Sequence, residues 1–222
     1  MKIFDITIIL FALTCLILCD HQLKFFYPAD NQNIHYTGRI DFSNPRKPRL
    51  SGAGSYFQCK FSGSTCDIFI EDQNLNNYHN YLAIVIDGAY LGRLQLNKNQ
   101  NTYSLAQNLK DTVHTLLVSK ATESQIGYVD FLGLTCKEIL PFEKTEKRKI
   151  EFIGNSITCG SGLDISDIPC DSAEWYDQHN AYLYLRSHNS PVFASRLALE
   201  CSFRNWHDPK LEQSGSDHAG SL

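Results

Sequence analysis

Eight short apolar runs follow one another between residues 24 and 140, and turn residues separate them. The runs are Tyr36–Phe42, Ser55–Phe61, Cys66–Glu71, Tyr81–Ile86, Tyr90–Leu96, Asn101–Leu105, Val113–Lys120 and Tyr128–Cys136. Short strands at this spacing, with no convincing helical pattern among them, are typical of a β-sandwich. We therefore expect residues 24–140 to form a β-sandwich domain.

The clearest turn in this region is Asp87-Gly88, which lies between Val85-Ile86 and Ala89-Tyr90. An Asp-Gly pair between two apolar runs favours a hairpin with a two-residue loop. The sequence therefore predicts that the runs on either side of Asp87 pair with each other.

The N-terminus carries an almost unbroken apolar run, Ile6–Leu18, shortly after Lys2. A run of ~13 residues is too short for a spanning helix, which needs ~20, and has the length of a secretory signal. We therefore expect residues 1–20 to be a signal peptide, no membrane span, and a secreted, periplasmic or cell-surface protein. Two alternatives stay open: lipidation at Cys19, and a buried N-terminal strand or helix.

The composition excludes some classes of protein. A net charge of −4 and a pI near 6.0 provide no basic surface for nucleic acid as a main partner. Aromatic residues make up 12% of the chain and charged residues 20%, which argues against disorder throughout. No grouped His, Cys and Asp spacing suggests a metal site.

Six cysteines follow the predicted signal, and an oxidising compartment would allow them to pair. Cys59 and Cys66 flank a Ser-Gly-Ser turn, and a hairpin there would bring them face to face. We expect a Cys59–Cys66 disulfide, with two half-buried thiols as the alternative. Four cysteines remain unassigned: Cys136, Cys159, Cys170 and Cys201.

After residue 140 the pattern changes. Residues 141–149 form a polar, charged stretch that reads as a linker, and residues 150–222 suggest an incomplete α/β unit. Ser190-Pro191 resembles a helix start, with helical spacing continuing to Glu200. The polar stretch 210–222 reads as a disordered tail. Trp175 and Trp206 either pack on the sheet or stack on sugar rings.

A strand that ends in a glycine and leads to a serine opens the second region. It reads Lys149-Ile150-Glu151-Phe152-Ile153-Gly154-Asn155-Ser156-Ile157-Thr158-Cys159-Gly160. A serine at the end of a rigid element, with backbone N–H groups nearby, is placed to act as a nucleophile. Gly-Asn-Ser is also an ordinary turn sequence. The block resembles the Gly-Asp-Ser block of SGNH (GDSL-type) hydrolases, with Asn155 in place of Asp, and its continuation resembles carbohydrate esterase family 2.

The resemblance extends to the first region, where three short sequence segments fit the jelly-roll module that precedes the catalytic domain in that family. They are Tyr36-Thr37-Gly38-Arg39, Ile70-Glu71-Asp72 and Ser119-Lys120-Ala121-Thr122-Glu123. The resemblance implies a secreted carboxylic ester hydrolase, acetylxylan esterase-like, that removes O-acetyl groups from polysaccharides without a cofactor. Ser156 would be its nucleophile and an oxyanion donor, Gly154 would permit the tight turn, and Asn155 would stand where the family usually has Asp.

The family's later blocks are not recognisable in this chain. They would add a glycine and an asparagine to the oxyanion hole and supply the catalytic histidine. Residues 201–209 contain no glycine, and the strand expected before them looks deleted. The resemblance therefore implies a C-terminally truncated SGNH-hydrolase domain, and we expect little or no activity from the 222-residue chain alone.

None of the eight histidines is a convincing catalytic base. Asp111-Thr112-Val113-His114 fits the family's Asp-x-x-His block literally. It precedes the serine, on a predicted strand, so we interpret His114 as a strand residue. His207 and His218 follow the serine but lack the surrounding block.

Three function classes stay open on sequence grounds. The first is a secreted carbohydrate O-deacetylase that lacks its catalytic histidine. The second is a non-catalytic carbohydrate-binding sandwich with a vestigial esterase segment. The third is another serine hydrolase, for which the polar, aromatic-rich composition favours carbohydrate over lipid substrates.

Overall fold

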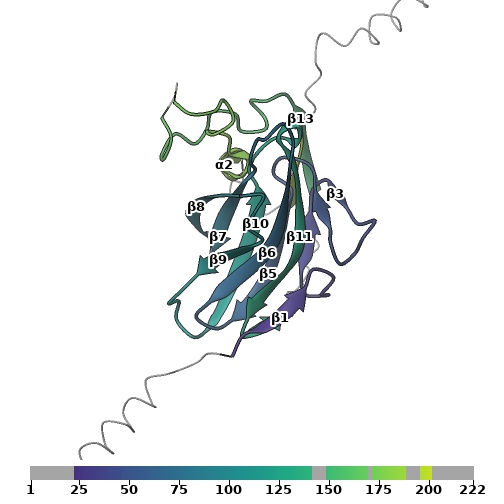
Figure 1. Ribbon diagram of the computed structural model, residues 1–222, viewed down its shortest axis with the longest axis vertical. Coiled ribbons are helices and arrows are strands. Elements are labelled where there is room, and N and C mark those ends of the chain that lie inside the picture. The colour runs from purple at the N-terminus through teal and green to yellow at the C-terminus, as the bar shows by residue number, and fades with distance from the viewer. Residues whose placement is uncertain (1–22, 142–148, 170–171, 189–195, 202–222) are drawn as a thin grey trace, which may run out of the picture.

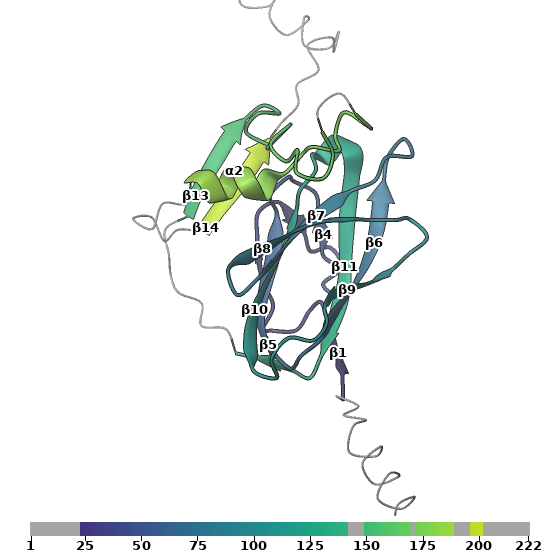
Figure 2. The same cartoon turned by 90° about the vertical axis from the view of Figure 1, so that its left-hand side faces the viewer.

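The protein is described from a computed structural model that covers residues 23–141, 149–169, 172–188 and 196–201. Two antiparallel sheets pack face to face as a β-sandwich (Figure 1). A short helix and a pair of strands lie at one end of this sandwich (Figure 2). The predicted sandwich is therefore confirmed. The expected signal peptide, the charged linker segment 142–148 and the expected tail lie outside the described residues.

Each sheet of the sandwich has six strands. In the first, the order is β3-β4-β11-β6-β9, and β1 pairs with β11. These strands are β1 Phe25–Pro28, β3 Ile40–Asp41, β4 Arg49–Leu50, β6 Cys66–Asn74, β9 Thr102–Ala106 and β11 Gly127–Cys136. In the second, the order is β12-β5-β10-β7-β8, and β2 pairs with β5. These strands are β2 His35–Thr37, β5 Tyr56–Ser62, β7 Tyr81–Ile86, β8 Ala89–Gln95, β10 Val113–Lys120 and β12 Glu138–Leu140.

The Asp87-Gly88 hairpin is confirmed. Asp87 and Gly88 both have positive φ, 51° and 77°, as a two-residue hairpin turn of the primed type requires. Ile86 pairs with Ala89 across the turn, so β7 and β8 are neighbours in the sheet. The turn residues therefore set the register at this sheet edge.

The predicted run Tyr36–Phe42 is two strands in the structure, β2 and β3, which belong to different sheets. The chain leaves one sheet at Gly38, whose φ is +104°. A Cβ at this position would lie 2.8 Å from the Cα of Ser55. Glycine is therefore required where the chain crosses between the two sheets.

The core lies between the sheets and consists of side chains that alternate along each strand. In β6 every second residue from Cys66 to Asp72 is buried, the pattern of a strand with one face on a core. Phe57 of β5 stacks on Phe131 of β11 with ring centroids 3.9 Å apart. This aromatic pair ties the two sheets together at the centre of the sandwich.

The expected Cys59–Cys66 disulfide is wrong. Both cysteines are free and fully buried, as is Cys136. The reason is topological: β5 and β6 belong to different sheets, so the Ser-Gly-Ser segment crosses the sandwich instead of closing a hairpin. Cys59 pairs in register with Leu116 of β10, and Cys66 pairs with Ala106 of β9.

The helix expected from Ser190-Pro191 to Glu200 is also wrong for residues 196–201. These residues form a strand, β14 (Arg196–Cys201), which runs parallel to β13 (Lys149–Gly154). The strand expected after that helix would follow residue 200, and residues 202–209 lie outside the described part. The helix of this region is α2, Ala181–His188, and residues 189–195 lie outside the described part. Leu197-Ala198-Leu199 is a short apolar run, which periodicity alone cannot assign to helix or strand.

The second region thus begins as a strand–helix–strand unit, β13-α2-β14, in which a helical connection joins two parallel strands. A 3-10 turn, η1 (Ser124–Ile126), precedes β11 at the adjoining end of the sandwich. Among the described residues, no helix is long and apolar enough to cross a membrane.

Candidate functional site

The serine turn starts where β13 ends, at Gly154. A Cβ added to Gly154 would collide with the side chain of Thr158, which folds back over the end of the strand. The close approach of Thr158 therefore explains why glycine stands before Asn155 and Ser156. The structure places Gly154, Asn155 and Ser156 together on this turn, as the sequence predicts.

Backbone hydrogen bonds hold the turn in a helix-like shape. The Asn155 carbonyl accepts from the N–H of Cys159 at 3.1 Å, and the Ser156 carbonyl accepts from the N–H of Ser161 at 2.9 Å. The Asn155 side chain accepts from the N–H of Ile157 at 3.1 Å. An Asx bond of this kind is an alternative to backbone pairing at the start of a turn. Asn155 therefore shapes the turn from its first residue.

Ser156 is half-buried at the surface of this turn, between exposed Asn155 and Ile157. Within the described parts of the chain, neither the Oγ nor the N–H of Ser156 makes a hydrogen bond. A serine on a constrained turn, with its hydroxyl and its N–H both unengaged, has the geometry of a nucleophile that also donates to an oxyanion.

Residues after the turn fasten it to the segment before α2. The N–H of Asn180 donates to the carbonyl of Gly160 at 2.9 Å. Gly160 has φ +79°, and a Cβ there would collide with the Asn180 carbonyl. Ser161 Oγ lies 2.9 Å from Nε2 of His179, within hydrogen-bond distance. Gly160 and Ser161 therefore contact Asn180 and His179, which directly precede α2.

His179 is fully buried at this junction. Burial, together with the nearby positive charges of Lys120 and Arg93, lowers the pKa of His179 to about 4, so the ring is neutral at neutral pH. Sequence reasoning missed this histidine, because nothing in the polar run around it distinguishes it from a surface residue. Its role depends on contacts with residues far away in the chain.

Asp164 is the centre of a buried polar cluster between the serine segment and strand β8. Its carboxylate accepts from the hydroxyl of Tyr90 at 2.8 Å and from the side-chain amide of Asn180 at 2.8 Å, and it pairs with Nε of Arg93 at 3.0 Å. Burial alone would raise its pKa, but hydrogen bonds from Ser166, Asn180 and Tyr90 prevail and lower the pKa of Asp164 to about 2. The sandwich therefore holds the serine segment through an ionised carboxylate.

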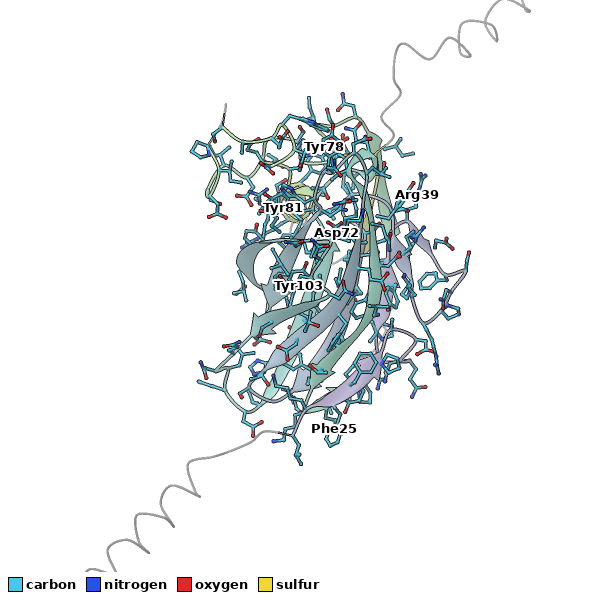
Figure 3. The ribbon with its side chains drawn as sticks, viewed as in Figure 1. Phe25, Arg39, Asp72, Tyr78, Tyr81 and Tyr103 are labelled. Carbon is cyan, nitrogen blue, oxygen red and sulfur yellow. The ribbon has the colours of Figure 1, made fainter. Side chains whose placement is uncertain are left out.

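A second polar cluster lies beside the first. Asp177 accepts from the Tyr81 hydroxyl at 3.0 Å and lies 3.0 Å from Nε2 of His79. Figure 3 shows Tyr78 and Tyr81 at the end of the sandwich that faces these loops. Trp175 contacts the Tyr78 ring edge-on and is 50% exposed. Trp175 therefore packs on Tyr78 with part of its surface and leaves the rest accessible.

Lys120 is fully buried beneath these clusters. Its ammonium donates to the carbonyls of Thr122 at 2.7 Å and Glu123 at 2.9 Å. Burial lowers the pKa of Lys120 to about 7, although Asp72 and Glu123 act in the opposite direction. Lys120 and Glu123 belong to segment 119–123, one of the three short segments that resemble the family's jelly-roll module.

The other predicted site residues lie elsewhere or outside the described part. His114 is a strand residue, as its sequence context predicts; it lies on β10 and bonds Asp87 at 2.6 Å. Trp206, His207 and His218 lie outside the described residues. In the described ranges, no histidine contacts Ser156, and no three His, Cys, Asp or Glu side chains gather as a metal site. Cys159, directly after the turn, is disulfide-bonded.

Comparison with known proteins identifies relatives for both regions. Residues 36–142 match the family model described as carbohydrate esterase 2 N-terminal. The chain is 36% identical to the cellulase/esterase CelE of Acetivibrio thermocellus. The 135 aligned residues cover 60% of this chain and 16% of CelE. It is 29% identical to an acetylxylan esterase/glucomannan deacetylase of Cellvibrio japonicus. The 186 aligned residues cover 79% of this chain and 49% of that protein.

Solved structures agree with these matches. A family two carbohydrate esterase from Clostridium thermocellum, in complex with cellohexaose, aligns with a TM-score of 0.64 at 28% identity, over 75% of this chain and 50% of that chain. A family two carbohydrate esterase from Cellvibrio japonicus aligns with a TM-score of 0.70 at 19% identity, over 81% of this chain and 52% of that chain, and shows the shared fold alone. The chain thus spans half or less of its curated relatives and about half of these structures.

Proposed function

Residues 36–142 place the chain in carbohydrate esterase family 2, and from that premise we propose that the protein is a serine esterase that removes O-acetyl groups from polysaccharides. The observation that carries the proposal is the position of Ser156. It stands on a constrained turn at the carboxyl end of a parallel strand, with no hydrogen bond to its Oγ or N–H in the described residues. Ligands of α/β sheets bind at this end of the strands.

The β13-α2-β14 unit supports an SGNH-type α/β domain behind Ser156. In an acyl-transfer site of this kind, the serine must lie on a rigid element, and a parallel strand pair with a helical connection provides one. The collision that a side chain at Gly154 would meet agrees with this reading, because it keeps the turn tight.

In the proposed reaction, Ser156 Oγ attacks the carbonyl carbon of an acetyl ester while a histidine takes the serine proton. The Ser156 N–H donates to the oxyanion of the tetrahedral intermediate. Collapse of the intermediate breaks the ester bond, and the histidine returns the proton to the departing sugar hydroxyl. Water then attacks the acetyl-serine, and acetate leaves as Ser156 regains its proton. The catalytic base of this proposal is a histidine of a later block.

His114, His79 and His179 do not suit the role of that base. His114 lies on a sandwich strand and bonds Asp87, and His79 bonds Asp177 and Tyr81. His179 is sealed from solvent, and a pKa of about 4 makes it a weak base. A general base works best with a pKa near the operating pH.

The proposed substrate is an acetylated polysaccharide of the kind that the relatives' names describe. The Cellvibrio relative is an acetylxylan esterase and glucomannan deacetylase, and the Clostridium structure holds cellohexaose. The half-exposed ring of Trp175 supports a carbohydrate, because an apolar aromatic face suits a sugar ring. The apolar run Ile6–Leu18 supports export of the protein to the compartment where such polymers occur.

Release of acetate from acetylated xylan and glucomannan tests the proposal. We expect a version of the chain that is extended to a complete catalytic domain, called the full-length protein below, to release acetate, and its Ser156→Ala variant to release none above background. Ser172→Ala is the matched control, because Ser172 is exposed, bonds the Pro169 carbonyl at 2.5 Å and lies outside the serine turn. Acetate release that survives in Ser156→Ala, or its absence in the unmodified full-length protein, would overturn the proposed function.

A further inference from the structure

Three hydrogen bonds form a brace behind the serine turn. The N–H of Ser161 holds the Ser156 carbonyl at 2.9 Å, and the N–H of Asn180 holds the Gly160 carbonyl at 2.9 Å. The third bond joins Ser161 Oγ to His179 Nε2 at 2.9 Å. Ser161 thus holds the nucleophile's own carbonyl with its backbone, and His179 with its side chain.

The ring of His179 is enclosed by its neighbours. It is fully buried, and its centroid lies 5.2 Å from that of Trp175, with the two rings 72° apart. On its other side, Nδ1 faces Glu123 Oε1 of the sandwich at 3.8 Å, beyond hydrogen-bond distance. The charged groups around the ring are Lys120, Arg93, Asp177 and Glu123. The sandwich therefore fixes where Nε2 of His179 stands.

In space, Ser161, His179 and Glu123 are arranged as the serine, histidine and acid of a hydrolytic triad would be. The structure argues against a catalytic role for them. The third link is open at 3.8 Å, and within the described residues Nδ1 of His179 and Oε1 of Glu123 have no hydrogen-bond partner. The ring is also sealed from solvent and a weak base. What the geometry does supply is a fixed, neutral hydrogen-bonding partner for Ser161.

We propose that His179 is a positioning residue that holds the Ser156 turn in its reactive geometry through Ser161, so that the sandwich braces the nucleophile. The inference rests on the proposed function of Ser156. In the described part of the chain, the outer side of the turn has no such support, since Ile157 is 70% exposed. A displacement of about 1 Å at a reacting group can reduce the rate about 100-fold, so the brace would act on turnover more than on substrate binding.

Four variants of the full-length protein test the brace. His179→Phe fills the ring's space without a hydrogen bond, and His179→Gln places an amide near the position of Nε2. Ser161→Ala removes the other partner, and the control Ser172→Ala removes an exposed hydroxyl that bonds the Pro169 carbonyl instead. The readouts are kcat and KM for 4-nitrophenyl acetate, hydrogen exchange at the Ser161 amide, and the melting temperature.

We expect His179→Phe and Ser161→Ala to lower kcat about 10- to 100-fold while KM changes less than about threefold. Exchange at the Ser161 amide should become at least about tenfold faster in both. His179→Gln should recover most of kcat and most of the protection, and Ser172→Ala should match the unmodified protein in kcat.

Unchanged kcat and exchange in Ser161→Ala would overturn the proposal, whether or not His179→Phe folds. A folded His179→Gln protein that is as impaired as His179→Phe would also overturn it, since burial of a ring would then explain the loss. If the unmodified protein hydrolyses no acetyl ester, the proposed function fails. Exchange at the Ser161 amide still decides whether His179 holds the turn.

Discussion

Arg93 of the sandwich and Asp164 of the serine segment form an ion pair with 3.0 Å between Nε and Oδ2, and their side chains are only 2% and 4% exposed. The Arg93 guanidinium also donates to the carbonyls of Asp177 and His179. One buried cation thus joins strand β8 to three points around the serine turn. The sandwich is therefore a structural part of the candidate site.

We predict that Arg93→Met lowers the free energy of unfolding by about 3–5 kcal/mol, because it leaves the Asp164 carboxylate buried without its counter-ion. The matched control is Lys137→Met, which breaks the Lys137–Asp111 pair, where the side chains are 49% and 45% exposed. An exposed pair contributes about 0–1 kcal/mol. Urea denaturation measures both, and equal effects of the two substitutions would contradict the buried role of Arg93.

Lys120 gives a prediction for pH. Its pKa is about 7 in the folded protein against an ordinary 10.5, so between these values the unfolded chain binds more protons and stability rises with pH. The charged groups facing Lys120 are Asp72 and Glu123. We expect the free energy of unfolding to rise by no more than about 1.4 kcal/mol per pH unit between pH 7 and about 8.5. The window ends there because cysteine thiols titrate little below about pH 8.5.

The measurement is urea denaturation of the unmodified protein and of Lys120→Met at several pH values in this window. The free energy of unfolding should rise with pH in the unmodified protein, and its slope should be much smaller in Lys120→Met. Identical slopes would show that another group causes the pH dependence.

The three free cysteines of the core give a prediction about reactivity. Burial raises the pKa of the thiols of Cys59, Cys66 and Cys136, the last to about 12, and a thiol reacts as its thiolate. We expect iodoacetamide to leave all three unmodified in the native protein and to modify all three after unfolding without a reductant. Peptide mapping that finds any two of them joined by a disulfide would contradict the free thiols.

Gly154→Ala tests the contact that shapes the serine turn. The added methyl group collides with Thr158, so we expect the substitution to displace Ser156 and to lower kcat for 4-nitrophenyl acetate about 100-fold. The double variant Gly154→Ala, Thr158→Gly removes the obstacle and should regain part of that loss. If Gly154→Ala keeps full activity, the close approach of Thr158 does not shape the site.

Local patterns in the sequence predicted the sandwich well. Tyr81–Ile86 and Val113–Lys120 were predicted to the residue, and Asp87-Gly88 forms its hairpin. Strand pairing was harder to predict, because a Ser-Gly-Ser segment suits a hairpin as well as a crossing between sheets. That ambiguity produced the wrong disulfide.

The site was predictable only in part, for a related reason. The glycine-serine turn is a local motif, so Gly154, Asn155 and Ser156 could be found from adjacent residues. The contacts between the sandwich and the loops of the second region depend on pairs such as Arg93–Asp164 and His79–Asp177, whose members are 71 and 98 positions apart. No periodicity or turn signal marks such pairs, and only the folded chain brings them together.

The most direct test of the central claim is to trap the acyl-enzyme. The full-length protein is mixed with 4-nitrophenyl acetate that carries an isotopically labelled acetyl group, quenched in acid within the first turnover, and analysed by peptide mass spectrometry. We predict the labelled acetyl group on Ser156, and its loss in Ser156→Ala. Label on Ser161 instead, or turnover with no acetyl group on either serine, would contradict the assignment of Ser156 as the nucleophile.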